Sequence, residues 1–240
     1  MEGGLRSNSD EVEKIMIAFA IYTSPPPAAE PLLEEKPLKG LLLNLMPRNM
    51  DMSKFGERRC RTMKKSEIKE LINKSVDHRQ LCRVKFDYDD NTWFVFPLLT
   101  NDRLFLCANE DDFILNGYSI RRFKDVEKTE YQDGKILSMV KIEKIDEKII
   151  VPDVDMTDWQ TIFTSLKEKN INIIIENEKA EENEDSFIIG RIIKATKTKV
   201  VMQHFDADGI WEEEFYEVPY TKITSISFGT RYVETFSKYL

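Results

Sequence analysis

The sequence of 240 residues predicts a mainly β fold with short helices, organised as two successive units that each hold one helix and five strands. Apolar and polar side chains alternate in short runs, the pattern of half-buried strands, and turn residues separate the runs. The same order of elements appears twice, with a period of about 90 residues, which indicates a duplicated architecture. We expect an extension over residues 1–62 and two units over residues 63–145 and 146–240.

Residues 1–62 differ from the rest of the chain in composition. Six of the nine prolines fall between Pro25 and Pro47, and proline removes backbone donors and blocks the continuation of helices. We therefore expect this segment to be disordered or to be no part of the native protein. Because Met63 runs directly into a helical pattern, we hypothesise that translation begins there, which the N-terminal mass of the native protein would test.

Neither a membrane span nor a secretory signal is expected. The longest apolar run covers residues 15–22, which is eight residues against the roughly 18 that a membrane helix needs. Asp10, Glu11 and Glu13 precede this run, where a signal peptide requires positive charge. The three cysteines form no C-x-x-C pair and no disulfide framework, so we expect a cytoplasmic protein.

The first unit begins with a helix over residues 64–77, because Ile68, Leu71, Ile72 and Val76 recur at spacings of three and four. From residue 81 the period changes to two, as in a strand. Turn residues then divide the chain into five strands, over residues 81–88, 93–99, 104–107, 117–123 and 126–132. The Asp133-Gly134 pair is typical of a two-residue hairpin, so residues 135–145 are expected to pair back as a further strand.

The second unit repeats this order. Trp159, Ile162 and Leu166 lie on the apolar stripe of a helix of about 12 residues, which Thr157 or Asp158 can cap. The acidic residues 176–185 predict a solvated loop, and a closing helix is expected around residues 232–239. The five strands are expected over residues 171–176, 187–195, 199–205, 210–218 and 223–228.

The order of elements over residues 63–132 and 157–228, together with Ile120-Arg121 just before the last strand of the first unit, resembles the Sm-like family. The chain is similar to a tandem Sm-like protein of uncharacterised bacterial type. The resemblance implies two small, strongly bent, five-stranded barrels, each with a helix at its start; SH3-like barrels share this strand count. Arg122 stands where family members have Gly, and Asn101-Asp102 falls in a turn of different spacing from the family's base-binding pair.

The charge of the chain argues against polyanionic partners. The formal net charge is −8, and residues 63–240 carry all of it, with 34 acidic and 26 basic side chains. A surface of this sign repels the phosphate backbone of nucleic acids and the anionic surface of membranes. We therefore expect neither as a partner, whereas a basic protein partner is compatible with the charge.

Few residues offer catalytic or metal chemistry. His204, Asp206 and Asp208 form the one cluster of metal-ligand types, but the run is typical of a tight turn and lacks the spacing of a calcium loop. Cys82 lies on the apolar side of its strand, where thiols are mostly inert, and His78 falls at a helix end. We therefore predict no metal, no cofactor and no catalytic residue, and we expect a protein that is not an enzyme.

The function that these observations favour is a non-enzymatic interaction or scaffold module. Small bent barrels leave strand edges that accept another strand through main-chain hydrogen bonds, either from the other unit, from a second copy of the chain, or from a partner protein or peptide. The alternative is an RNA-binding regulator of the Sm-like kind. In that alternative Arg83, Lys85, Arg121 and Arg122 bind the nucleic acid, and neighbouring aromatic side chains stack on its bases.

Overall fold

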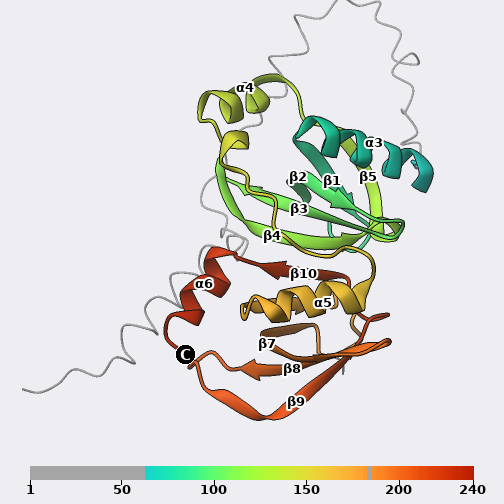
Figure 1. Ribbon diagram of the computed structural model, residues 1–240. Helices are drawn as coiled ribbons and strands as arrows, with labels where there is room; N and C mark the ends of the chain where they lie inside the picture. The colour runs from blue at the N-terminus through green and yellow to red at the C-terminus, as the bar shows by residue number, and fades with distance from the viewer. Residues whose placement is uncertain (1–62, 183–184) are drawn as a thin grey trace, which may run out of the picture. The chain divides into compact units, whose positions relative to one another are not determined.

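The protein is described here by a computed structural model over residues 63–182 and 185–240 (Figure 1). The predictions about residues 1–62, including a start at Met63, lie outside the described residues. We call residues 63–145 the first half and residues 146–240 the second half. The first half contains α3 (Lys65–His78), β1 (Cys82–Phe86), β2 (Thr92–Thr100), β3 (Leu104–Asp111), β4 (Ile114–Arg122), the 3-10 turn η2 (Phe123–Asp125), β5 (Val126–Tyr131) and α4 (Gly134–Ile142).

The second half repeats one helix and five strands. It opens with a short 3-10 turn and ends in a helix. Its elements are η3 (Asp146–Lys148), α5 (Trp159–Glu168), β6 (Asn172–Glu176), β7 (Phe187–Ala195), β8 (Lys199–Phe205), β9 (Trp211–Pro219), β10 (Ser225–Phe228) and α6 (Arg231–Ser237). None of the helices in the described residues is both long enough and apolar enough to cross a membrane.

The ten strands form one antiparallel sheet in the order β5-β1-β2-β3-β4-β10-β6-β7-β8-β9. Each half therefore contributes five strands, and in each half the fifth strand lies beside the first. The two sets meet where β4 pairs with β10, with Ile120 opposite Ile226 and Arg121 opposite Ser225. Both isoleucines are fully buried, so this pairing joins the halves through a core as well as through main-chain hydrogen bonds.

The predicted mainly β fold with short helices is confirmed, but the sheet is open. β5 and β9 stand at its two ends, and each has one strand neighbour within the described residues. The resemblance implied two small bent barrels, with strand edges that can pair with the other unit, and two separate barrels are not confirmed. Instead, β4 of the first half takes a strand of the second half as its neighbour, because that pairing satisfies a strand edge that carries buried apolar side chains.

Helices cover the faces of the sheet and enclose its cores. α3 places Ile68 and Ile72 against a cluster that includes Phe86 and Phe105 of the first half. α5 packs Phe163 and its neighbours into a second cluster, which contains side chains from both halves. α6 covers a third and smaller cluster around Phe205. The predicted helices at residues 64–77, near Trp159 and at the C-terminus are all confirmed.

The strand predicted over residues 135–145 is wrong, because this segment forms α4 and the turn that follows it. Asp133 is extended and serves as the N-cap, and Gly134 has a φ of 67°, so the pair starts a helix rather than a hairpin. Ile136 and Val140 are four residues apart and both contact the core, which is the helical and not the strand period. We expected β structure throughout the connection between the two units, from about residue 132 to residue 155; it contains α4 and η3, and residues 149–156 form neither helix nor strand.

Candidate functional site

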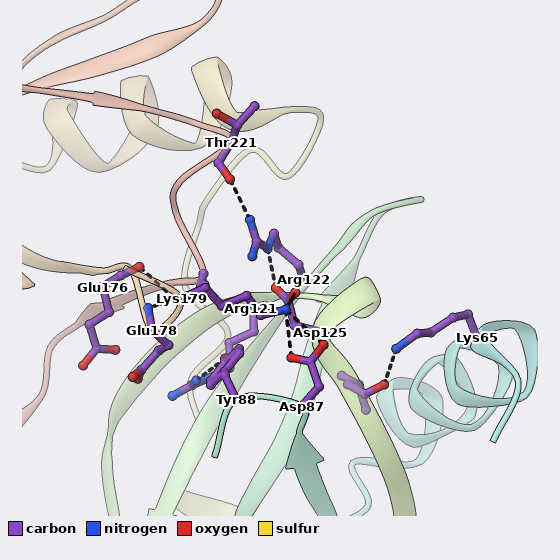
Figure 2. A network of polar contacts seen from close by, with 12 residues as sticks. Lys65, Asp87, Tyr88, Arg121, Arg122, Asp125, Glu176, Glu178, Lys179 and Thr221 are labelled. Carbon is purple, nitrogen blue, oxygen red and sulfur yellow. Dashed lines mark hydrogen bonds and ion pairs between the residues drawn. The ribbon is translucent and has the colours of Figure 1, made fainter. Parts of the chain in front are cut away.

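A polar network joins the two halves beside the β4–β10 pairing (Figure 2). Asp125 is 1% exposed and accepts hydrogen bonds from the guanidinium of Arg122 and from Lys179 Nζ, the latter at 2.9 Å. Lys179 also forms an ion pair with Asp87, and Arg122 Nη1 donates to the backbone oxygen of Thr221 at 3.1 Å. Burial lowers the pKa of Lys179, but its two carboxylate partners outweigh this and raise it above its usual value.

Arg121 is enclosed by aromatic side chains. Its guanidinium carbon lies 4.7 Å from the ring centre of Phe86 and 4.8 Å from that of Trp93, and Nη1 donates to the hydroxyl of Tyr88 at 3.1 Å. The residue is 3% exposed, and its Nε has no hydrogen-bond partner within the described residues. Burial raises the pKa of Tyr88 to about 12. Arg121 is therefore part of the packing between the sheet and its loops.

The structure does not bring the four basic residues of the RNA-binding alternative together. Arg83 and Lys85 lie on β1 between the side chains that enter the first-half core, so they point to the other face of the sheet. Arg83 forms an ion pair with Glu130 at 3.1 Å and Lys85 one with Glu127 at 3.4 Å. Arg121 and Arg122 are buried at the junction of the halves.

The cysteines of the described residues are packed as thiols. Cys82 contacts Ser75 Oγ at 2.9 Å, and burial raises the pKa of its thiol to about 11. Burial also raises the pKa of Cys107, which contacts Ser119 Oγ at 3.3 Å. Thiolate is the reactive form of cysteine, so both side chains are held in their unreactive form at neutral pH.

The cluster around His204 makes a turn. The carboxylate of Asp206 accepts the backbone N–H groups of Asp208 and Ile210, which shapes the loop between β8 and β9. His204 Nδ1 lies 2.7 Å from the backbone oxygen of Ile189. Among the described residues, no group of three His, Cys, Asp or Glu side chains is arranged to hold a metal ion.

The two end strands of the sheet differ in how their outer edges are covered. On β5, Lys65 Nζ donates to the backbone oxygen of Val126, and the backbone N–H of Thr129 points to Met63 Sδ at 3.5 Å. Lys65 at the start of α3 and Met63, two residues before the helix, thus contact this edge. β9 has β8 as its strand neighbour on one side and no strand of the described residues on the other.

The exposed side chains of β9 are acidic and apolar. Its sequence contains four glutamates and no lysine or arginine. Glu213 and Glu214 are exposed and form no ion pair within the described residues, whereas Glu217 is bound by Lys199. Phe215 is 55% exposed, and Ile210, the residue before the strand, is 63% exposed.

A cleft of about 960 Å³ opens where the starts of α3 and α5 meet the loops between strands. We call it the basic cleft, because six of its residues are cationic and two are acidic. The sequence alone did not reveal it, since its cations come from separate loops. One signal was available: Arg103 and Lys197 occupy the turns between the second and third strands of the two halves. The charged residues that line it are Lys65, Lys69, Asp102, Arg103, Arg122, Lys124, Asp158 and Lys197.

Comparisons with models of protein families, with curated proteins and with solved structures found no match to this chain.

Proposed function

We propose that the protein is a non-enzymatic interaction or scaffold module of the cytoplasm, which binds an extended segment of a partner protein along the outer edge of β9. The observation that carries the proposal is the difference between the two ends of the sheet. The edge of β5 is covered by Lys65 and Met63, whereas β9 leaves its outer edge without a strand in the described residues. Such an edge supplies main-chain hydrogen bonds to an added strand.

The side chains of β9 indicate which partner fits. Glu213 and Glu214 attract lysine or arginine, and Phe215 offers an exposed aromatic surface to an apolar side chain. A second copy of β9 would bring glutamates against glutamates, which is unfavourable between neighbouring strands. Because Glu213 and Phe215 share one face of the strand and Glu214 lies on the other, the proposed partner is an extended segment of another protein with basic and apolar residues on both of its faces.

We also propose that the two halves are duplicated units of the Sm-like or SH3-like kind. The support is the strand order, because in both halves the fifth strand lies beside the first and the first four follow in sequence. A helix precedes the strands in each half, as the resemblance implies.

We propose that the protein is not an enzyme, because the side chains that most often serve in catalysis are buried or contact the backbone. Cys82 and Cys107 are buried thiols with raised pKa values, and His204 lies against the backbone of β7. The RNA-binding alternative has less support, because Arg121 and Arg122 are buried and Arg83 and Lys85 are already paired with glutamates.

The test uses the full chain and two synthetic peptides, in which pairs of valines alternate with pairs of lysines in one and with pairs of glutamates in the other, so that each face of the peptide carries both residue types. The lysine peptide is expected to bind and to slow hydrogen exchange of the backbone amides of residues 211–219, while the glutamate peptide does not bind. The double variant Glu213→Lys, Glu214→Lys should weaken binding of the lysine peptide by about tenfold or more, since it reverses two charges beside the added strand.

The matched control is Glu143→Lys, Glu168→Lys, which makes the same change in charge at two exposed positions outside β9 and should leave binding unchanged. The proposal fails if neither peptide binds, if both bind equally, or if the exchange protection appears outside residues 211–219.

A further inference from the structure

The basic cleft has a charge opposite to that of the chain around it. Residues 63–240 carry 34 acidic and 26 basic side chains, and the cleft holds six of the basic and two of the acidic ones. Outside the cleft, 32 acidic and 20 basic side chains remain, a net charge of −12. The cleft is thus a local concentration of positive charge in an acidic protein, which draws in anions.

Both carboxylates of the cleft are already engaged. Asp102 Oδ1 accepts from Lys69 Nζ at 2.7 Å, and this contact holds the pKa of Asp102 below its usual value. Asp158 Oδ1 accepts the backbone N–H of Thr161 at 2.9 Å and caps α5. Asp102 also interacts electrostatically with Arg103, but within the described residues neither carboxylate forms an ion pair with Arg103, Lys124 or Lys197.

Three of the six cations are engaged and three are not. Lys69 is paired with Asp102, Lys65 donates to the backbone of β5, and Arg122 is held by Asp125. Within the described residues, the structure shows no hydrogen bond or ion pair for the side chains of three exposed residues, Arg103, Lys124 and Lys197.

The three unengaged cations come from three different loops and from both halves. Arg103 lies between β2 and β3, Lys124 between β4 and β5, and Lys197 between β7 and β8. They line one cavity, so like charges are gathered there, and the six cations of the cleft exceed its two carboxylates by four positive charges. A ligand with several negative charges would neutralise this repulsion.

We propose that the basic cleft binds a small ligand that carries two or more phosphate groups, held by Arg103, Lys124 and Lys197. The volume of about 960 Å³ is in the range of clefts that enclose small molecules. Ser66 and Thr198 also line the cleft, and their hydroxyls are suitable donors to phosphate oxygens. This site does not involve β9, so it stands or falls independently of strand binding.

A small ligand fits the charge distribution better than a nucleic acid does. Binding of a nucleic acid depends on many phosphate contacts along its backbone. A strand that continued beyond the cleft would meet a protein whose other side chains over residues 63–240 carry a net charge of −12. A compact polyphosphate places all of its charge inside the cleft.

Isothermal titration of the full chain with inorganic tripolyphosphate in 25 mM salt tests the proposal. Tripolyphosphate is expected to bind, and the double variant Lys124→Gln, Lys197→Gln should weaken its affinity by about tenfold or more, since two of the three free charges are lost. Lys124→Arg, Lys197→Arg should retain binding. Lys194→Gln, which removes an exposed lysine of β7 outside the cleft, is the matched control and should bind as the unchanged protein does.

All of these substitutions are at exposed positions, and equal melting temperatures of the variants will show that their folds are intact. The proposal is overturned if tripolyphosphate does not bind, or if the glutamine double variant binds it as tightly as the unchanged protein. It is also overturned if citrate binds as tightly, which would indicate a site for polyanions in general. Tighter binding of a mixed-sequence single-stranded RNA, lost in the same double variant, would replace it by a nucleic-acid site.

Discussion

At the scale of single residues, two glycines with nearly the same backbone conformation have different surroundings. Gly117 in β4 has a φ of 68°, and a Cβ atom there would lie 2.5 Å from the backbone nitrogen of Thr230. Gly134 at the start of α4 has a φ of 67°, and a Cβ atom there would meet nothing within 4 Å. Gly117 therefore allows the backbone of the first half to approach the chain that follows β10.

This comparison predicts the effects of two alanine substitutions. Gly134→Ala should lower the free energy of unfolding by about 1 kcal/mol, the cost of a left-handed conformation for a residue with a Cβ. Gly117→Ala should lower it by more than Gly134→Ala, since it adds a clash with fixed backbone atoms of Thr230 and Gly229 to the same strain. Urea denaturation of both variants measures the difference, and equal losses would contradict the close approach.

At the scale of elements, the local signals in the sequence were sufficient for most helices and strands. Residues 199–205 were expected as a strand and form β8 with the same bounds, because their alternation is local and their turns are short. α4 was missed because the dipeptide Asp133-Gly134 is compatible both with a hairpin turn, in which both residues have positive φ, and with a helix start, in which Asp133 is extended. The apolar spacing from Ile136 to Val140 was the signal that favoured the helix.

The candidate site was harder to predict than the elements. Arg121 and Arg122 look like surface residues in a basic pair, but the aromatic enclosure of one and the buried ion pair of the other depend on contacts between distant segments. The cations of the basic cleft likewise come from separate loops, and only the folded sheet brings them together. Local patterns in the sequence do not predict which side chains from distant segments come together in the fold.

Asp125, the buried carboxylate of the η2 turn between β4 and β5, is predicted to stabilise the fold. Asp125→Asn should lower the free energy of unfolding by about 3 kcal/mol, because Arg122 would keep its buried charge without a counter-charge. Lys179→Met should cost less than about 1 kcal/mol, since the side chain of Lys179 is 42% exposed and its ion pairs are screened by water. Chemical denaturation measures the free energy of unfolding of both variants. A larger loss for Lys179→Met than for Asp125→Asn would contradict the prediction.

At the scale of the whole molecule, the main finding is a sheet that passes without interruption from one half to the other. β4 and β10 supply the contact, and the side chains of both halves share one apolar cluster. The halves resemble each other in strand order, yet neither closes on itself. The second half therefore supplies β10 as the strand that pairs with the outer edge of β4.

A truncated chain tests this dependence. A chain that ends at Met156 retains α3 and β1–β5 but loses β10, so the edge of β4 and the side chain of Ile120 become exposed. We expect this fragment to aggregate, since unpaired edges with apolar side chains associate with one another. A chain that begins at Met63 keeps all ten strands and should remain monodisperse in gel filtration. A monomeric, folded fragment ending at Met156 would show that the halves are independent.

The outer edges of β5 and β9 are covered to different degrees, and this difference disfavours open-ended assembly of the protein. Head-to-tail growth requires that opposite ends of a subunit be complementary and accessible. Here Lys65 and Met63 occupy the β5 end, while the glutamates of β9 repel their own copies. Within the described residues the two ends of the sheet therefore differ. With one partner segment bound along β9, as proposed, the complex is expected to have a fixed stoichiometry and not to grow into filaments.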